Sequence, residues 1–400
     1  MHHKLFLVAF MALLIQNSLY SQNADTTFSQ NAANTLLTNA EKNRVTMGMY
    51  AEIDYNQQFG DSVKHAGNLD AHRLVLLFAY KFTNRATFVT EIEVEHVSEI
   101  YIEQAFLNVK VNDKLNVKGG MLLIPMGIIN EYHEPTIRNG VERPNVDQYI
   151  VPTTWREIGL GISGNFNNAS LAYQLYIVNG FIGYNGEGKF RGVDGYRKGR
   201  QKGAESVISS PNLSAKLDYY GIPGLKIGLS GYFGKSQTTA FNGVNPDDNY
   251  LMETADSSVV SIAMLGVDAR YRYKNFTARG EFIYSNNKNT AAYNQYTGKD
   301  LGEALLGFYV EAAYDFWPMI ANNTNHSLTP FVRIEKYNTQ QKMTDQSLIN
   351  NAYNRFDLVT GLGFWISPGA VVKADYQMLV NKVPNSNAVN MFNMGIGIWF

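Results

Sequence analysis

Cysteine is absent from this chain of 400 residues, and charged residues make up only 17% of it. Without thiols the chain can form no disulfide framework, no Cys-ligated zinc or iron–sulfur centre and no thiol nucleophile. The formal net charge is −1, which leaves no strong excess of basic residues for binding nucleic acid. We therefore expect no nucleic acid as a partner.

Only one stretch of the chain is both long and apolar, and it lies at the N-terminus. Lys4 precedes an apolar run over residues 5–15, and a polar stretch with small residues follows. This order is typical of a secretory signal peptide, which we predict at 1–21 with cleavage near Ser21. The alternative, a membrane anchor, is disfavoured because a spanning helix needs about 20 apolar residues. We expect the polar leader at 22–43 to be a periplasmic tail or a short helix.

The rest of the chain, 44–400, is rich in glycine and aromatic residues, and apolar and polar residues alternate through it. In one segment Phe308, Val310 and Ala312 alternate with Tyr309 and Glu311. Such alternation over segments of roughly 10 to 14 residues predicts β-strands. We place sixteen strands near 44–57, 69–81, 85–96, 100–111, 114–124, 155–166, 169–179, 207–220, 224–234, 259–273, 275–286, 303–316, 327–337, 354–367, 369–380 and 388–400.

The connections between these segments alternate between short and long. Tight turns are predicted at 112–113, 274–275 and 367–368, and only the connection at 317–326 departs from the order. The longest connections are predicted at 125–154, 181–206, 235–258, 286–302 and 338–353. Short periplasmic turns and long external loops are typical of transmembrane barrels. The pattern favours an all-β fold, a transmembrane antiparallel β-barrel of sixteen strands; a large periplasmic β protein is the alternative.

The third external loop, 125–154, is too long for a plain hairpin connection. It also carries apolar residues such as Ile128, Ile129 and Val146, which an exposed loop would not need. We therefore predict that it folds into the channel and narrows it. The candidate constriction residues are Glu131, His133, Glu134, Arg138, Glu142, Arg143 and Asp147. Glu131, His133 and Glu134 could also supply metal ligands by type, but a structural network within the loop is the preferred interpretation.

The same region resembles a family of porins. The stretches Pro125-Met126-Gly127, Asn130-Glu131-Tyr132-His133-Glu134-Pro135, Glu142-Arg143-Pro144 and 151–159 are similar to porins related to the phosphate-selective porins O and P, in the form seen in Bacteroidota. Val178-Asn179-Gly180, at the end of the seventh predicted strand, fits as well. The resemblance implies a sixteen-stranded barrel, usually trimeric, that passes small solutes and is narrowed by its third loop.

The predicted lumen carries charges of both signs. The candidate pore-wall residues are Glu91, Glu93, Glu95, Arg270, Arg272, Arg279, Arg333 and Arg355. Phosphate-selective members of the family line the pore with many basic residues, so this mixed wall favours a general channel. The glutamates and the arginines at 270–279 are expected on opposite sides of the barrel, where they could create a transverse field. Pairing of neighbouring charges along the wall is the preferred interpretation.

Two further segments indicate partners. The apolar face of the last strand ends at Phe400, which is similar to the C-terminal signature that the barrel assembly machinery recognises. The basic segment 189–202 could draw anions to the mouth or bind the phosphates of lipopolysaccharide. An ordinary solvated loop is the preferred interpretation. Outer-membrane lipid and lipopolysaccharide are the surroundings that we expect for the barrel.

Together these features predict a porin in the outer membrane of a Gram-negative bacterium, which lets small hydrophilic solutes or ions, including anions such as phosphate, diffuse through a water-filled channel. The alternatives are a receptor or adhesin with a closed lumen, and an outer-membrane hydrolase. The histidines after residue 21 are His65, His72, His96, His133 and His326, and none accompanies a recognisable nucleophile motif. His96 near Ser98 is the nearest candidate, and we treat it as a coincidence. We expect no enzymatic activity, no cofactor and no metal site.

Overall fold

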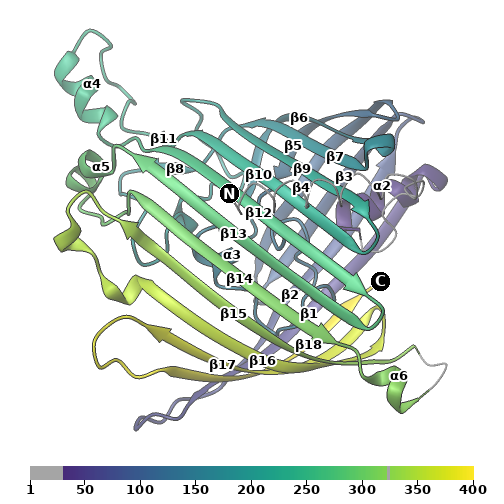
Figure 1. Cartoon of the computed structure of the whole chain (residues 1–400). Coiled ribbons are helices and arrows are strands. Elements are labelled where there is room, and N and C mark those ends of the chain that lie inside the picture. The colour runs from purple at the N-terminus through teal and green to yellow at the C-terminus, as the bar shows by residue number, and fades with distance from the viewer. Residues whose placement is uncertain (1–29, 322–324) are drawn as a thin grey trace, which may run out of the picture.

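The protein is a closed barrel of tilted antiparallel strands (Figure 1). The computed structural model describes residues 30–321 and 325–400, and the predicted signal peptide lies outside them. Within the described chain sixteen strands form the barrel, and β1 (Val45–Phe59) pairs with β18 (Val389–Trp399) to close it. Closure leaves this barrel without an edge strand whose backbone groups are unpaired. The predicted fold class and strand number are confirmed.

The other strands of the barrel are β2 (Asn68–Lys81), β3 (Ala86–Glu95), β4 (Glu99–Asn112), β5 (Leu115–Leu123), β6 (Arg156–Phe166), β7 (Leu171–Val178), β9 (Asn212–Ile222), β10 (Leu225–Lys235), β12 (Ser261–Tyr273), β13 (Phe276–Lys288), β14 (Ala304–Tyr314), β15 (Ser327–Lys342), β16 (Asn354–Ser367) and β17 (Ala370–Asn381). A small parallel pair, β8 (Ile182–Tyr184) and β11 (Gln237–Thr238), joins two of the long connections. The helices are α2 (Ala32–Lys42), α3 (Val146–Tyr149), α4 (Asn249–Asp256), α5 (Thr290–Thr297) and α6 (Trp317–Ile320). Single 3-10 turns occur at Asn167–Ala169, Arg197–Gly199, Gln346–Leu348 and Asn351–Tyr353.

The predicted strand bounds are wrong mainly at the ends that face the long connections. The strand predicted at 207–220 begins only at Asn212. The reason is that the backbone N–H groups of Ser209 and Ser210 donate to Gln237 Oε1 (2.6 and 2.9 Å) instead of joining the ladder. The strand predicted at 327–337 continues to Lys342, because β14 extends far enough to pair with it.

Side chains alternate between the lumen and the outer surface. In β14, Tyr309 and Glu311 are buried on the inner face, whereas Val310 is 58% exposed on the outer face. Leu160, Leu229 and many other large apolar side chains are exposed on the outer faces of their strands. A continuous apolar outer surface of this kind is typical of strands that face lipid. No helix in the described ranges is both long enough and apolar enough to span a membrane.

The two ends of the barrel differ as the sequence predicts. The long connections, with α4 and α5, lie at one end, and the tight turns lie at the other (Figure 1). The connection at 317–326, which departs from the predicted order, contains α6 and lies at the end of the tight turns. The third long connection therefore leaves from and returns to the end opposite the tight turns.

Residues 32–42 of the leader form helix α2, which lies inside the barrel at the end of the tight turns. The side chain of Asn31 caps the helix by accepting a hydrogen bond from the backbone N–H of Asn34 (3.0 Å). The buried stripe of α2 consists of Ala32, Ala33, Leu36 and Ala40. It packs in one apolar cluster with inward-facing residues of β2 and β3, among them Val75, Leu77 and Val89. Such apolar residues on the inner face of a channel need a cover, and α2 provides it.

Candidate pore constriction

The connection between β5 and β6, residues 124–155, is named loop L3 and runs across the lumen. Its backbone N–H groups donate to three carboxylates on the wall: Ile128 to Glu281 of β13 (2.7 Å), Val141 to Asp375 of β17 (2.6 Å), and Asn145 and Val146 to Glu335 of β15 (2.6 and 3.3 Å). These strands are far from β5 and β6 in the order of the barrel. L3 therefore spans the lumen from one side of the wall to the other.

Basic residues of the wall bind the carbonyl groups of the same loop. Lys216 Nζ donates to the carbonyl oxygen of Gly127 (2.7 Å). Lys373 Nζ donates to those of Pro135 (2.6 Å) and Gly140 (3.1 Å). A buried loop without regular secondary structure leaves backbone groups that need partners. Much of the mixed charge on the wall thus serves to hold L3.

Asn130 joins the two ends of L3. Its Nδ2 donates to the carbonyl oxygens of Ile124 (2.7 Å) and Trp155 (3.0 Å), and its Oδ1 accepts from the backbone N–H of Trp155 (2.7 Å). Trp155 is fully buried, and its ring stacks on Phe181 with the ring centroids 4.2 Å apart. One amide side chain therefore closes the loop at its base, next to an aromatic pair that holds the return strand.

His133 lies between two glutamates of the wall. Its Nε2 is 3.3 Å from Glu103 Oε2 and 3.6 Å from Glu91 Oε2, and all three side chains are buried. Burial alone lowers the pKa of His133, but the charge of Glu103 and its hydrogen bond, together with Glu91, outweigh burial and raise the pKa to about 10. His133 is therefore a cation at neutral pH, and it attaches L3 to β3 and β4.

The three loop residues considered as metal ligands have three different partners. Glu131 Oε2 accepts from Lys216 Nζ (2.6 Å), whereas His133 contacts the wall glutamates. Glu134 Oε1 accepts from the backbone N–H of Ala32 at the start of α2 (2.6 Å), and burial raises the pKa of Glu134 to about 7. These side chains do not form a common ligand set; each one fixes L3 to a different part of the barrel.

Arg138 and Glu142 fix the middle of L3 to β1. Arg138 forms an ion pair with Glu52, whose Oε2 also accepts from Arg73 Nε (3.1 Å). Arg138 Nε donates in addition to the carbonyl oxygen of Val141 (3.1 Å), which folds the loop back on itself. Glu142 Oε1 accepts from the side chain of Asn56 (2.8 Å). Both residues act as anchors of the loop.

Asp147 differs from the other loop residues because it lacks a polar partner. It is fully buried, and neither carboxylate oxygen accepts a hydrogen bond within the described part of the chain. Burial, followed by the charges of Glu281 and Glu335, raises the pKa of Asp147 well above its ordinary value. The surroundings of Asp147 therefore favour the protonated form of its carboxyl group more than water does.

Most of the predicted wall residues pair with near neighbours or with L3. Arg279 contacts Glu311 (2.8 Å), Arg333 contacts Glu335 (2.7 Å) and Glu311 (3.4 Å), and Glu93 contacts Arg73 (3.8 Å). Arg270 and Arg355 lie over the rings of Tyr132 and Tyr149 of L3, 4.0 and 4.6 Å from the centroids. Arg272 is exposed near the tight turns and lies apart from this group. The charges of the wall are thus arranged in local pairs, and they do not form opposed rows of glutamates and arginines across the lumen.

Five basic side chains gather where L3 ends and β6 begins, and the sequence did not predict this grouping. This basic cluster consists of Arg143 of L3, Arg156 at the start of β6, and Arg197, Arg200 and Lys202 of the next long connection. Arg197 and Arg200 both donate to the carbonyl oxygen of Thr153, the former at 3.2 Å. Arg156 Nη1 donates to Thr154 Oγ1 (3.1 Å). The basic segment 189–202 was visible in the sequence, but Arg143 and Arg156 are brought to it only by the fold.

The cations of this cluster are crowded. Burial, followed by the charges of Arg197, Arg156 and Arg143, lowers the pKa of Arg200 to about 9. Burial, followed by Arg200 and Arg156, lowers the pKa of Lys202. Arg156 is 2% exposed, and its Nε and Nη2 lack hydrogen-bond partners among the described residues. The cluster therefore contains hydrogen-bond donors without acceptors among the described residues, and neighbouring carboxylates do not balance its positive charge.

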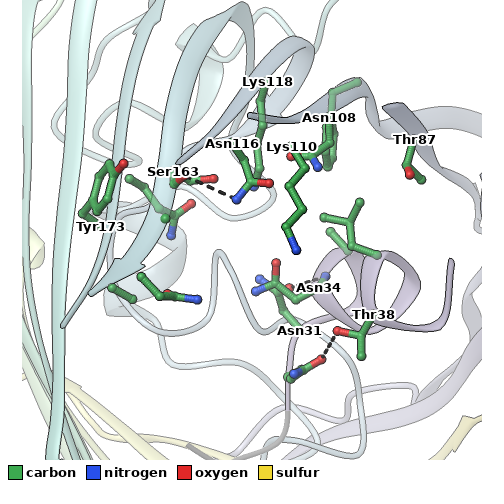
Figure 2. Close-up of a pocket in the computed structure, with 18 of the residues that line it drawn as sticks. Asn31, Asn34, Thr38, Thr87, Asn108, Lys110, Asn116, Lys118, Ser163 and Tyr173 are labelled. Atoms are coloured by element: carbon green, nitrogen blue, oxygen red, sulfur yellow. Dashed lines mark hydrogen bonds between the residues drawn. The ribbon is translucent and has the colours of Figure 1, made fainter. Parts of the chain in front are cut away.

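A cavity of about 710 Å³ lies between α2, the inner wall of β4 to β10, and L3 (Figure 2). Its lining is mainly polar, with Asn108, Asn116 and Lys118 on the wall facing Asn31 and Asn34 of the leader. Glu131 and Tyr132 of L3 also line it. The cavity thus connects the end of the tight turns with the constriction, and α2 takes up part of that opening.

The comparisons with known proteins agree with this architecture. No family model matches the sequence. An uncharacterized protein of Aquifex aeolicus is 30% identical over 346 residues, which cover 84% of this chain and 76% of that protein. The resemblance to the phosphate-selective porins O and P remains a prediction.

The solved structures that share the fold come from outer membranes. The channel DcaP of Acinetobacter baumannii has a TM-score of 0.56 at 11% identity, covering 89% of this chain and 97% of that one. OmpF of Salmonella typhi has a TM-score of 0.55 at 11% identity, with coverage of 90% and 98%. The trimer form of OmpT of Vibrio cholerae has a TM-score of 0.50 at 10% identity, with coverage of 90% and 100%. The chain therefore has the fold of the outer-membrane porins and belongs to the same family as the Aquifex aeolicus protein.

Proposed function

We propose that the protein is an outer-membrane porin through which small hydrophilic solutes diffuse passively, with a preference for anions. The apolar outer surface, the closed barrel and the polar cavity inside it support a channel. The observation that carries the anion preference is the basic cluster at the return of L3. Its crowded cations, of which Arg156 is the most buried, offer unused hydrogen-bond donors beside the constriction.

Burial, and after it the charges of the neighbouring arginines, lower the pKa of Arg200, and an anion near this cluster would offset the repulsion between these arginines. Arginine donors suit phosphate and carboxylate groups, so phosphate belongs to the class of anions that we expect to pass. The other charges of the lumen are mostly paired with each other or with the backbone of L3. The channel is therefore proposed to prefer anions without excluding cations.

The test is an electrical recording from the purified, folded protein in planar lipid bilayers. We expect stepwise, ohmic conductance and a reversal potential in asymmetric KCl that indicates anion preference. Replacing Arg197 and Arg200 together with Gln should move the reversal potential towards cation preference and weaken competition by phosphate. Lys198→Gln is the matched control, because Lys198 is exposed on the same turn and should leave the reversal potential unchanged.

The results of these recordings distinguish the proposed function from its alternatives. A silent bilayer with correctly folded protein would remove the channel and favour a receptor or adhesin with a closed lumen. A channel whose reversal potential is unaffected by the double replacement would leave the porin but remove the role of the basic cluster.

The remaining parts of the proposal concern location and partners. We propose that the barrel lies in the outer membrane of a Gram-negative bacterium, in contact with lipid and lipopolysaccharide, after assembly that depends on Phe400. The trimer form of the Vibrio cholerae protein supports a homotrimer. We propose no catalysis: Ser98 Oγ donates to the backbone carbonyl of His96 (3.3 Å) and not to its ring, so the one candidate pair lacks the arrangement of a nucleophile and its base.

A further inference from the structure

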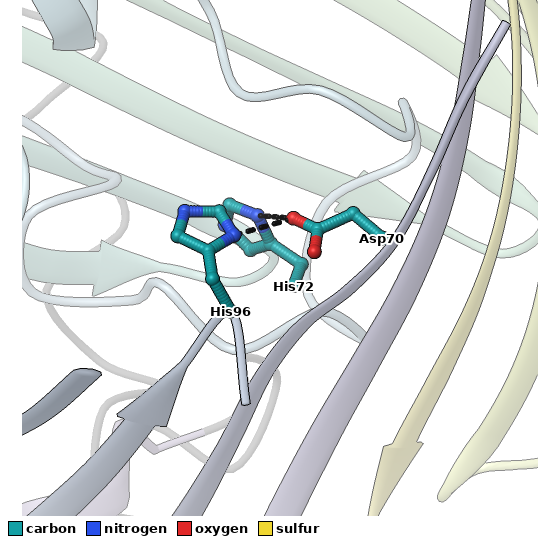
Figure 3. Close-up of side chains that lie close together, drawn as sticks. All are labelled: Asp70, His72 and His96. Atoms are coloured by element: carbon teal, nitrogen blue, oxygen red, sulfur yellow. Dashed lines mark hydrogen bonds and ion pairs between the residues drawn. The ribbon is translucent and has the colours of Figure 1, made fainter. Parts of the chain in front are cut away.

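We propose that Asp70, His72 and His96 form a binding site for a divalent transition-metal ion, such as Zn²⁺, at the end of the barrel that carries the long connections. The three side chains converge from β2 and from the turn after β3 (Figure 3). His96 Nδ1 is 2.6 Å from Asp70 Oδ2, and His72 Nδ1 is 3.6 Å from the same oxygen. The two imidazole rings meet edge to face, with the centroids 5.4 Å apart.

The backbone of a β-hairpin holds this arrangement. The ladder between β2 and β3 includes the pair Arg73 and Glu95, and the backbone N–H of His96 then donates to the carbonyl oxygen of His72 (3.1 Å). His72 and His96 are thus neighbours across two paired strands, whose side chains lie close together. Asp70 is two residues before His72 on the same strand, and alternation puts these two on one face. Ligands that project from paired strands are held more firmly than ligands on a free loop.

The chemistry of the three side chains suits a metal ion. Imidazole and carboxylate groups are common ligands of zinc, and imidazole also suits copper and nickel. One donor atom from each residue lies within 4.8 Å of the others, so small side-chain movements bring them to the bond lengths of about 2.0 to 2.2 Å that zinc requires. The ion would take the place of the hydrogen bond between His96 Nδ1 and Asp70 Oδ2.

The side chains of this group are accessible to solvent, unlike those of the other group of potential metal ligands in the described chain. The side chains of Asp70, His72 and His96 are 23%, 31% and 47% exposed, which leaves room for a water molecule as a fourth ligand. The second group, Glu91, Glu103 and His133, is fully buried, and there a protonated histidine already balances the carboxylates. The external group is therefore the one that an ion can enter.

The test measures Zn²⁺ binding to the untagged chain from residue 22 onwards, which lacks His2 and His3 of the predicted signal peptide, folded in detergent micelles, by isothermal titration calorimetry. We expect one zinc ion per chain. His72→Gln or His96→Gln should weaken this binding by about tenfold or more, and the double variant should abolish it. X-ray absorption of the zinc-loaded protein should show two imidazole ligands. His65→Gln is the matched control, because His65 Nε2 pairs with Asp61 Oδ2 (2.7 Å) without a second histidine.

Equal zinc binding by the wild type and the double variant would overturn the proposal, as would a loss of binding in the His65 variant alone. Circular dichroism and heat-dependent electrophoretic mobility establish that each variant is folded. If a histidine variant does not fold, Asp70→Asn tests the same site, because it removes the carboxylate that lies next to both histidines. The measurement needs no ion conduction, so its outcome is independent of whether the protein is a channel.

Discussion

At the scale of single residues, many charged side chains in this barrel hold the loop that crosses its lumen. Asp375 binds a backbone N–H of L3, Lys373 binds two of its carbonyl groups, and His133 projects from L3 into a pair of wall glutamates. From the sequence, the same charges could be assigned only to the lumen. Their partners depend on contacts over as many as 238 positions, as for Pro135 and Lys373, which alternation along one strand does not specify.

His133 gives a prediction on pH. Its pKa in the folded protein, about 10, is above the value of about 6.5 for an unperturbed histidine. The stabilisation of the folded protein by protonated His133 is therefore fully present below pH 6.5 and is lost as the pH rises through 10. We expect His133→Gln to lower the thermal unfolding midpoint at pH 7, because Glu91 and Glu103 then remain buried without their cation, at a cost on the order of 3 kcal/mol. The difference from the wild type should shrink towards pH 10.

Thermal unfolding in detergent at a series of pH values measures this difference. His326→Gln is the control, since His326 lies near the tight turns, where its Nδ1 contacts the carbonyl oxygen of Ile366 (2.7 Å) and its ring packs against Trp317 and Phe364 without a carboxylate partner among the described residues. Parallel curves for the wild type and the His133 variant would contradict the assignment.

At the scale of elements, L3 and α2 both obstruct the lumen but are attached differently. L3 is bound by side chains of β9, β13, β15 and β17, so its removal would leave several buried charges without partners. Helix α2 is held by an apolar stripe and by a few polar contacts at its two ends: the backbone N–H of Ala32 donates to Glu134, and Glu41 accepts from Lys81 Nζ (2.9 Å) and lies 3.8 Å from Lys110 Nζ. The helix is therefore the obstruction that can be removed with the smaller change to the barrel.

Deleting residues 30–42 should increase single-channel conductance while the barrel remains closed, because α2 takes up part of the opening and β1 begins only at Val45. Leu36→Asn should act in the same direction but less strongly, since it weakens the apolar stripe. Asn39→Ala, on the exposed face of the helix, is the control. Single-channel recording measures all three, and an unchanged conductance after the deletion would place α2 outside the conducting path.

The strands were predictable because alternation is a local property, and the inward course of L3 was predictable from its length and its apolar residues. The position of α2 was not. Its stripe from Ala32 to Ala40 is short, and its cover for Val75 and Leu77 depends on which face of β2 points inward. The pairing of His72 with His96 was missed for a similar reason, because it depends on the register between β2 and β3.

At the scale of the whole molecule, closure depends on the two ends of the barrel sequence. The backbone N–H of Phe400 donates to the carbonyl oxygen of Met49 (3.0 Å), and that of Met49 donates to the carbonyl oxygen of Phe400 (2.9 Å). The side chain of Phe400 is 71% exposed. Closure therefore uses the backbone of the last residue and leaves its ring available to another protein.

Phe400→Ala separates these two roles. The purified variant should refold in detergent with a stability within about 0.5 kcal/mol of the wild type, because both backbone hydrogen bonds remain and the ring is exposed. Its amount in the outer membrane of a Gram-negative host should fall severalfold if the assembly machinery recognises the ring. Ile396→Ala is the control, since it removes another exposed apolar side chain of β18. Equal amounts in the membrane would contradict recognition of the C-terminal aromatic residue.

The contacts between L3 and the wall also constrain the order in which the parts of the barrel assemble. The loop precedes β13, β15 and β17 in the chain, yet Ile128, Asn145 and Val141 bind residues of those strands. These contacts can form only after the later strands have joined, and long-range contacts are slow to form. The attachment of L3 to this side of the wall is therefore completed only when the last strands of the barrel are in place.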